Sequence, residues 1–329
     1  MIKLTMLIPP AVDRRWPLAS QMGIRHVIAK LAPELTGKLP PWDYDSLRSE
    51  VDRYAEGGFR IAGMEGDQFD MTRIKLGQPG RDDDIELYKR MLQNMGRCGI
   101  DLLCYNFMPL GWLRNRLNIA DRGGATTTGY THADEGELDT PVTLDADSLW
   151  DNYNYFIQRV IPAAEDAGVR MAMHPDDPPA PMIRGIARIF INADASQRAL
   201  DLVDSPMHGL TFCQATYKTM GEDVEALVRR FGAQNKIFYV HIRDVKGIWT
   251  DFVETFPESG DTDMAAMFRA YRDIGFDGYL RPDHAPSMVG APTPQSFEGG
   301  VSVGYEPEGM VYTIGYIKGL MQATGMQWC

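Results

Sequence analysis

Eight short apolar runs recur along the 329-residue chain, and most of them end in polar residues. Their nearly continuous hydrophobic character is typical of strands that are buried on both faces, as in a parallel sheet. We therefore predict eight strands, called here the first to the eighth run. The runs cover residues 4–9, 26–33, 59–66, 101–109, 169–176, 210–217, 237–245 and 278–286.

Segments with helical periodicity separate these runs, and several of them end at glycine, a common residue just beyond a helix C-terminus. The predicted helices cover residues 46–58, 84–99, 144–168, 195–205, 222–232, 263–275 and 308–325, and a short one lies within 13–25. Eight strand–helix repeats predict an α/β fold, a (β/α)8 TIM barrel, with residues 1–329 forming a single domain. A doubly wound sheet is the alternative, although no G-x-G-x-x-G or phosphate-loop motif supports it.

Two connections are long: residues 110–143 after the fourth run and residues 286–304 after the eighth. We expect both to be long, unpatterned loops. Both leave the C-terminal ends of their strands, which is the face where the active sites of TIM barrels lie. Lids, binding loops and oligomer contacts are the usual roles of such loops.

The composition limits the possible binding partners of the protein and the cellular compartment in which we expect it. The formal net charge of −12 argues against nucleic acid or an anionic membrane as a partner, because both require a basic surface. No apolar stretch reaches the roughly 18 to 20 residues of a membrane span, and the first residues lack the features of a signal peptide. Four cysteines do not make a disulfide scaffold in a chain of this length, so we expect a reducing cytoplasm. We also expect a homo-oligomer, which is common among such barrels.

Potential metal ligands gather at the ends of four consecutive strands. The fifth run includes His174, the sixth Cys213, the seventh His241, and the eighth Asp283 followed by His284. Consecutive strand ends surround one mouth of a barrel, and imidazole, thiolate and carboxylate all bind borderline divalent cations. A single histidine or cysteine at such a place is more often structural, but the coincidence predicts a divalent metal site with a position left open for substrate or water.

The motifs at these strand ends resemble those of the mannonate dehydratase family. They are YNFMP (105–109), HPDDPP (174–179), TFCQATY (211–217), HIRDVKG (241–247), GDTDM (260–264), RPDH (281–284) and the GY…GYIKGL pattern (304–320). The resemblance covers roughly residues 100–325 in order. It implies a TIM-barrel hydro-lyase, dependent on Mn²⁺, Fe²⁺ or another divalent metal, that removes water from D-mannonate or a related aldonate to give 2-keto-3-deoxy-D-gluconate.

The resemblance also implies roles for individual residues. It assigns the metal to His174, Cys213, His241 and Asp283, the same set that the strand ends indicate. It assigns substrate handling and proton transfer to Arg281, His284 and Tyr305, which we group with Asp283 as catalytic candidates. His284 adjoins a ligand and is our candidate acid or base, since a dehydration needs a base at C2 and an acid at the C3 hydroxyl. For Arg281, a structural ion pair is the alternative to a clamp on the substrate carboxylate.

Four further polar residues are candidates for substrate contacts: Arg243, Asp176, Asn106 and Glu65. Asp176 follows His174 in a proline-bounded turn, where capping of the turn is an equally good interpretation. Trp112 and Trp249 lie in predicted loops over the mouth and are candidates for packing on a sugar.

Two other functions remain open from the residues alone. A metal-dependent isomerase, epimerase or lyase of the xylose-isomerase-like barrels would use similar chemistry, although such enzymes favour a shell rich in Glu and Asp. A barrel without activity that binds a sugar acid or a protein is the second alternative.

Overall fold

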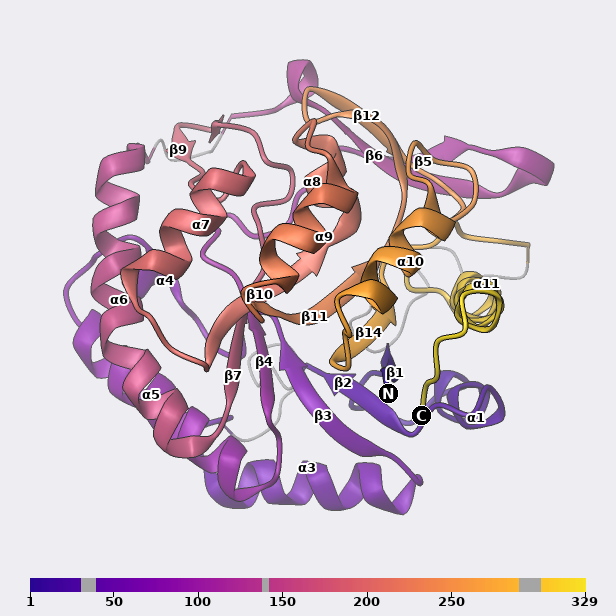
Figure 1. Ribbon diagram of the computed structural model, residues 1–329. Coiled ribbons are helices and arrows are strands. Elements are labelled where there is room, and N and C mark those ends of the chain that lie inside the picture. Colours follow the sequence, from indigo (N-terminus) through magenta and orange to yellow (C-terminus); the bar gives the residue numbers. More distant parts are fainter. Residues whose placement is uncertain (31–39, 138–141, 290–302) are drawn as a thin grey trace.

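The computed structural model describes residues 1–30, 40–137, 142–289 and 303–329. Eight parallel strands close into a barrel in the order β1-β14-β11-β10-β7-β4-β3-β2. These strands are β1 (Lys3–Leu7), β2 (His26–Ala29), β3 (Arg60–Glu65), β4 (Leu102–Tyr105), β7 (Arg170–Met173), β10 (His208–Cys213), β11 (Ile237–Ile242) and β14 (Tyr279–Pro282). Each of the eight predicted runs overlaps one barrel strand, so the TIM-barrel prediction is confirmed (Figure 1).

Helices surround the barrel on the outside (Figure 1). The larger ones are α1 (Arg15–Gln21), α3 (Tyr44–Glu56), α5 (Arg81–Arg97), α6 (Ala146–Ala167), α7 (Ala193–Leu202), α9 (Val224–Gly232), α10 (Met264–Asp273) and α11 (Pro307–Ala323). Side chains at Asp43, Asp145, Asn192, Asp223 and Asp263 accept hydrogen bonds from the first free backbone N–H groups of their helices. Such N-caps explain why the helices begin where they do.

Two packing layers form the core. Between strands and helices lies a large cluster of aliphatic and aromatic side chains, and inside the barrel lies a smaller one that includes Ile28, Leu102 and Tyr239. Helices α5 and α6 approach so closely that a Cβ at Gly96 would lie 2.3 Å from the Ala167 carbonyl oxygen. Only glycine fits that contact.

The strand register sets up the site. Cys213 on β10 is paired with His241 on β11, and His241 is paired with Arg281 on β14. Residues at the same height of neighbouring parallel strands lie close together. The ends of β10, β11 and β14 therefore present their side chains to one mouth.

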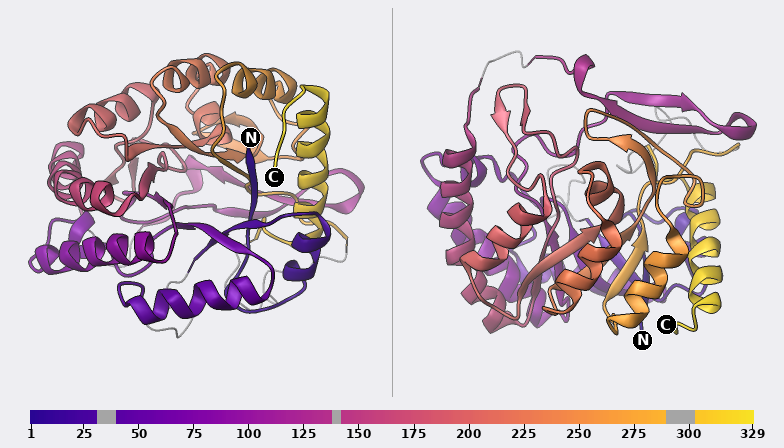
Figure 2. Two further views of the ribbon diagram at one scale, coloured as in Figure 1. Left: turned by 60° about the horizontal axis from the view of Figure 1, so that its bottom comes forward. Right: turned by 45° about the horizontal axis from the view of Figure 1, so that its top comes forward.

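The prediction for residues 110–143 is wrong in one respect, because this segment is not an unpatterned loop. It contains β5 (Arg116–Ala120) and β6 (Thr126–Thr131), with the short helices η1 (Arg122–Gly124) and η2 (His132–Asp134). A second hairpin, β12 (Val245–Ile248) and β13 (Asp251–Glu254), joins it to form a four-stranded antiparallel sheet in the order β12-β13-β6-β5. We call this the cap sheet; it lies over the C-terminal ends of the barrel strands (Figure 2).

Smaller elements complete the chain: α4 (Thr72–Lys75), α8 (Gln214–Thr219), β8 (Met182–Ile183) and β9 (Ile186–Ala187). The predicted sixth strand is too long, since the chain turns into α8 directly after Cys213. Of the predicted loop 286–304, residues 290–302 lie outside the described residues, while Ser287 pairs with Thr126 of the cap sheet.

The two ends of the chain meet at the opposite end of the barrel from the cap sheet, where Ile2 pairs with Trp328 (Figure 2). Among the described residues, none of the helices has the length and apolar character that a membrane span needs.

Candidate active site

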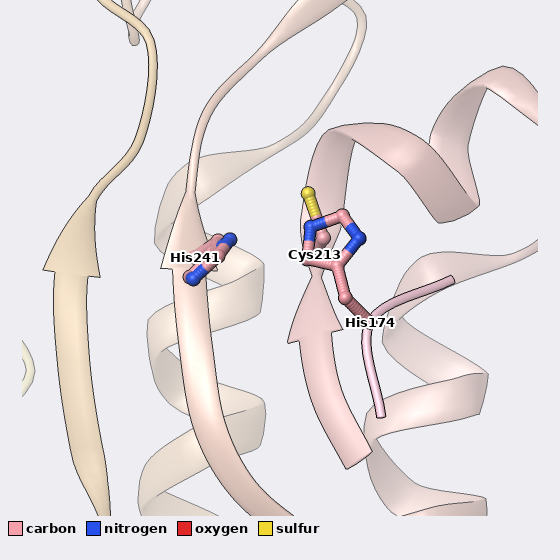
Figure 3. Close-up of side chains that lie close together, drawn as sticks. All are labelled: His174, Cys213 and His241. Atoms are coloured by element: carbon pink, nitrogen blue, oxygen red, sulfur yellow. The ribbon is translucent and has the colours of Figure 1, made fainter. Parts of the chain in front are cut away.

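Three potential metal-binding side chains meet at the mouth of the barrel. His174 follows β7, Cys213 ends β10 and His241 lies near the end of β11 (Figure 3). One ligand atom from each lies within 4.8 Å of the others, and all three residues are buried. Since imidazole nitrogen and thiolate sulfur both suit borderline divalent cations, this cluster could hold such an ion.

The imidazole rings of His174 and His241 differ in their hydrogen bonds. Nδ1 of His174 lies 2.6 Å from the Pro175 carbonyl oxygen, which can only accept, so Nδ1 carries the hydrogen and Nε2 keeps its lone pair. Burial lowers the pKa of His174 and favours its neutral form.

His241 is buried, and among the described residues neither of its ring nitrogens has a hydrogen-bond partner. The nearest acceptors are Glu65 Oε2 at 3.5 Å from Nε2 and Asp283 Oδ2 at 4.0 Å from Nδ1. An unsatisfied buried polar group costs free energy, so a partner for this ring is expected.

Asp283, the first residue after β14, lies beside the three donors. Its Oδ2 is 3.8 Å from the Cys213 sulfur, and its Oδ1 accepts a 2.6 Å hydrogen bond from the Tyr305 hydroxyl. Burial alone would raise the pKa of Asp283, but Arg281 and Arg243 hold that pKa well below its ordinary value. The carboxylate is therefore ionised and within reach of the cluster.

Arg281 is fully buried, and its donors are directed at protein groups. Nε donates to Glu65 Oε2 at 3.0 Å and Nη2 to Glu65 Oε1, while Nη1 lies 3.0 Å from Asp283 Oδ1. The Tyr239 hydroxyl also donates to Glu65 Oε2. These contacts correspond to the structural ion pair that the sequence left as the alternative role of Arg281.

His284 and Tyr305 stand next to the cluster. The rings meet edge to face with centroids 4.9 Å apart. Nδ1 of His284 lies 2.8 Å and 3.0 Å from the two carboxylate oxygens of Glu254, so this nitrogen donates. Burial raises the pKa of the Tyr305 hydroxyl well above its ordinary value, which keeps it protonated.

Arg243 connects the barrel with the cap sheet. Nη2 donates to Asp177 Oδ2 and Thr216 Oγ1, and Nη1 lies 3.2 Å from both Glu254 Oε1 and Asp283 Oδ2. Its Nε is buried and has no hydrogen-bond partner among the described residues. The Nε–H group of Arg243 is therefore available as a hydrogen-bond donor.

Arg114, from the segment before β5, forms a fork with Asp177. Nη1 and Nη2 donate to the two Asp177 oxygens at 2.9 Å each, and Nε and Nη2 also donate to Glu254 Oε1. Bidentate pairs of this kind are strong and fix both partners.

Most of the remaining predicted substrate contacts bind protein groups. Asp176 Oδ2 accepts hydrogen bonds from the backbone N–H groups of Ile189 and Phe190, which lie outside its own turn, while its Oδ1 is buried and has no hydrogen-bond partner among the described residues. Asn106 accepts from Lys75 Nζ and donates to Asp67. Trp112 is over a third exposed and lies edge-on to His174, whereas Trp249 packs on His132 of η2.

Four carboxylates and three guanidinium groups form one connected network at the mouth: Glu65, Asp177, Glu254 and Asp283, with Arg114, Arg243 and Arg281. With the histidines neutral, the network thus carries one excess negative charge, and a Cys213 thiolate would add another. Buried excess charge is unfavourable unless it is compensated. A divalent cation between His174, Cys213 and His241 would compensate it.

Comparison with known families agrees with the motifs. The sequence model of the family described as D-mannonate dehydratase (UxuA) matches residues 18–144 and 135–327. The chain belongs to the mannonate dehydratase family. Members of this family are hydro-lyases, so the hydro-lyase prediction is confirmed.

Curated relatives and solved structures extend this result. Mannonate dehydratase 2 of Halalkalibacterium halodurans is 38% identical over 247 residues, 66% of this chain and 71% of that protein. The enzyme of Thermotoga maritima is 30% identical over 306 residues, 82% and 84% of the two chains. The crystal structure of mannonate dehydratase from Streptococcus suis superposes with a TM-score of 0.87 at 30% identity, covering 99% of this chain and 95% of that one.

More distant barrels share only the fold. A D-psicose 3-epimerase from Clostridium cellulolyticum superposes with a TM-score of 0.63 at 12% identity, over 98% and 99% of the two chains. This likeness agrees with the barrel fold.

Sequence reasoning missed two members of the ion-pair network at the barrel mouth, Glu254 and Arg114. Glu254 lies in TDFVETF, where polar and apolar residues come in pairs and do not alternate, so no strand signal marked this position. Arg114 lies in a segment that has no strand pattern either. The sequence does not reveal that Arg114 meets both Asp177 and Glu254, because the contact with Glu254 depends on where the cap sheet lies.

Proposed function

We propose that this chain is a metal-dependent dehydratase that converts D-mannonate or a related aldonate into 2-keto-3-deoxy-D-gluconate or the corresponding acid. Membership of the mannonate dehydratase family supports the reaction class. The observation that carries the proposal is the convergence of His174, Cys213 and His241 beside Tyr305 and His284 at one barrel mouth.

The donors fit a divalent ion, for which we propose Mn²⁺, with Fe²⁺ or another divalent metal as the alternative. His174 Nε2, Cys213 Sγ and a nitrogen of His241 would bind it, and Asp283 is the proposed fourth ligand. The unpartnered ring of His241 and the excess negative charge of the network both support this assignment. When bound, such an ion would stabilise negative charge that develops next to the substrate carboxylate.

The reaction removes a proton from C2 and the hydroxyl group from C3, and the resulting enol becomes the 2-keto-3-deoxy acid. His284 is the proposed acid or base, because its Nδ1 donates to Glu254 and leaves Nε2 free to exchange a proton. Tyr305 is the proposed second proton donor, held by Asp283.

Arg243 is a proposed substrate contact, since its Nε has no hydrogen-bond partner among the described residues. Asp176 stays a proposed substrate contact, because its buried Oδ1 has no hydrogen-bond partner among the described residues. For Arg281, Glu65 and Asn106 we propose a positioning role, because their polar atoms already bind protein groups. These residues would keep the mouth rigid while the substrate is exchanged.

The proposal is tested with a panel of C5 and C6 aldonates and added Mn²⁺. Formation of a 2-keto-3-deoxy acid is expected for mannonate or a stereoisomer, and the metal-stripped protein should form none. Interconversion of aldoses and ketoses without loss of water would instead favour the isomerase or epimerase alternative. No reaction with any substrate and no bound divalent ion would favour a barrel without activity.

We also propose that the protein works as a homo-oligomer in a reducing cytoplasm, without nucleic-acid or membrane partners. The acidic net charge supports the absence of such partners, and the four free cysteines support the reducing compartment. Light scattering coupled to size exclusion would measure the mass; a monomeric mass of 36.9 kDa at micromolar concentration would contradict the oligomer.

A further inference from the structure

We propose that Glu254, which the cap sheet carries to the barrel mouth, is a positioning residue that fixes the orientation and the tautomer of His284. This inference rests on the proposed function, in which His284 exchanges a proton with the substrate. Glu254 lies on none of the barrel strands, and it is 30 residues away from His284 in the sequence.

The contact between Glu254 and His284 involves only one ring nitrogen, Nδ1. Nδ1 of His284 lies 2.8 Å from Oε1 and 3.0 Å from Oε2 of Glu254. A carboxylate without a proton can only accept, so Nδ1 must carry hydrogen. The other ring nitrogen, Nε2, is then the one that can accept a proton in the neutral ring.

Glu254 is itself held in place from three sides. Arg114 and Arg243 donate to Oε1, and the hydroxyl of Thr128 on β6 donates to Oε2. Burial alone would raise the pKa of Glu254, but Arg114 holds that pKa below its ordinary value, so the side chain stays an acceptor. A fixed acceptor costs no reorganisation when a proton moves at the histidine.

The cap sheet explains why this arrangement exists. Glu254 is the last residue of β13, and β13 pairs with β6, which carries Thr128. His284 follows β14 of the barrel. The Glu254 carboxylate and the His284 imidazole therefore come from two different sheets. Their alignment depends on the position of the cap sheet relative to the barrel.

A double-mutant cycle tests whether Glu254 acts through His284. With Mn²⁺ and saturating aldonate, E254Q is expected to lower kcat about 100-fold, the lower range for a general acid or base, with little change in KM. In the H284Q background, E254Q should change kcat by no more than about twofold, since the group it orients is gone. T128V should lower kcat in the same direction as E254Q, but less, because it removes only one of the bonds that hold Glu254.

The matched control is E258Q. Glu258 pairs with Arg122 and Tyr312 on the outer side of the cap-sheet region, so this variant makes the same chemical change away from His284. It should keep wild-type kcat, and all variants should keep wild-type metal content. Equal effects of E254Q in both backgrounds, or wild-type kcat for E254Q, would overturn the inference while leaving the proposed function intact.

A second readout is independent of turnover. Nitrogen chemical shifts of 15N-histidine-labelled protein report which ring nitrogen carries hydrogen, and His284 is assigned by comparison with H284Q. In the wild type Nδ1 of His284 should be protonated, and in E254Q the Nε2-protonated tautomer should appear. An unchanged tautomer in E254Q overturns the inference. If the wild type dehydrates no aldonate, the proposed function fails, and this measurement still decides whether Glu254 sets the tautomer.

Discussion

The ion pair between Glu65 and Arg281 is the best place to measure what holds the mouth together. Arg281 is fully buried, and its Nε and Nη2 both donate to the Glu65 carboxylate. The substitution Glu65→Gln keeps the volume of the side chain but removes the charge that the guanidinium faces. We expect a large loss of stability, because a buried cation then lacks its main partner.

The structure sets the size of this loss. Removing one partner of a buried ion pair costs about 3–5 kcal/mol, and Asp283, 3.0 Å from Arg281 Nη1, remains as a second carboxylate. The lower value of about 3 kcal/mol is therefore expected. An unfolding entropy of about 2.1 cal/mol/K per residue gives about 0.7 kcal/mol/K for this chain, so Tm should fall by about 4 °C.

The pH of the measurement matters. Burial would raise the pKa of Glu65, but Arg281 holds it well below its ordinary value. A carboxylate with a lowered pKa in the folded state contributes its full stability above the pKa of the unfolded chain and loses it as the pH falls through the folded pKa. The difference between Glu65→Gln and the wild type should thus be complete at pH 7 and shrink only in strong acid.

Calorimetry at pH 7 would compare the wild type, Glu65→Gln and the double variant Glu65→Gln with Arg281→Met. The double variant should recover much of the lost stability, since it leaves no unpaired charge inside the barrel. A Tm of Glu65→Gln equal to that of the wild type, or a double variant less stable than the single one, would refute the reasoning.

Three further outcomes are expected. Cys213→Ser should sharply lower the metal content, measured by elemental analysis, without loss of the circular-dichroism spectrum; unchanged metal would exclude Cys213 as a ligand. Burial raises the pKa of Asp244 from 3.8 to about 6, so the folded state favours the protonated side chain. In denaturant titrations, the stability of the wild type relative to Asp244→Asn should therefore fall by about 3 kcal/mol between pH 3 and pH 7. A constant difference would contradict this. Gly129→Ala should lower kcat far more than Tm, because its Cβ would lie 2.5 Å from the Phe252 carbonyl oxygen and disturb only the cap sheet; a normal kcat would show that the sheet tolerates the change.

The barrel was predictable because each of its strands is buried on both faces. In β10 and β11 every residue is buried, and such runs stand out in a sequence whose helices are amphipathic. The clustering of His174, Cys213 and His241 followed from the same pattern, since the ends of neighbouring parallel strands must meet at one rim. Local pattern and simple topology were sufficient for both.

The cap sheet was not predictable in this way. Its central pairing joins β6 to β13, about 120 residues apart, and β5 is too exposed and too polar to form an apolar run. Contacts of this kind depend on where the barrel places the two hairpins. Glu254 and Arg114 were missed for this reason, although Arg243 and His284, which Glu254 contacts, were identified.

The cap sheet also ties together two halves of the barrel wall. One of its hairpins follows β4 and the other follows β11, and these strands lie three positions apart in the closed order. Widening of the wall between them would strain the hydrogen bonds of β6 with β13, the strand that carries Glu254 to His284. Under the proposed function, the width of the barrel mouth and the position of the proton-exchanging histidine would therefore depend on the same small sheet.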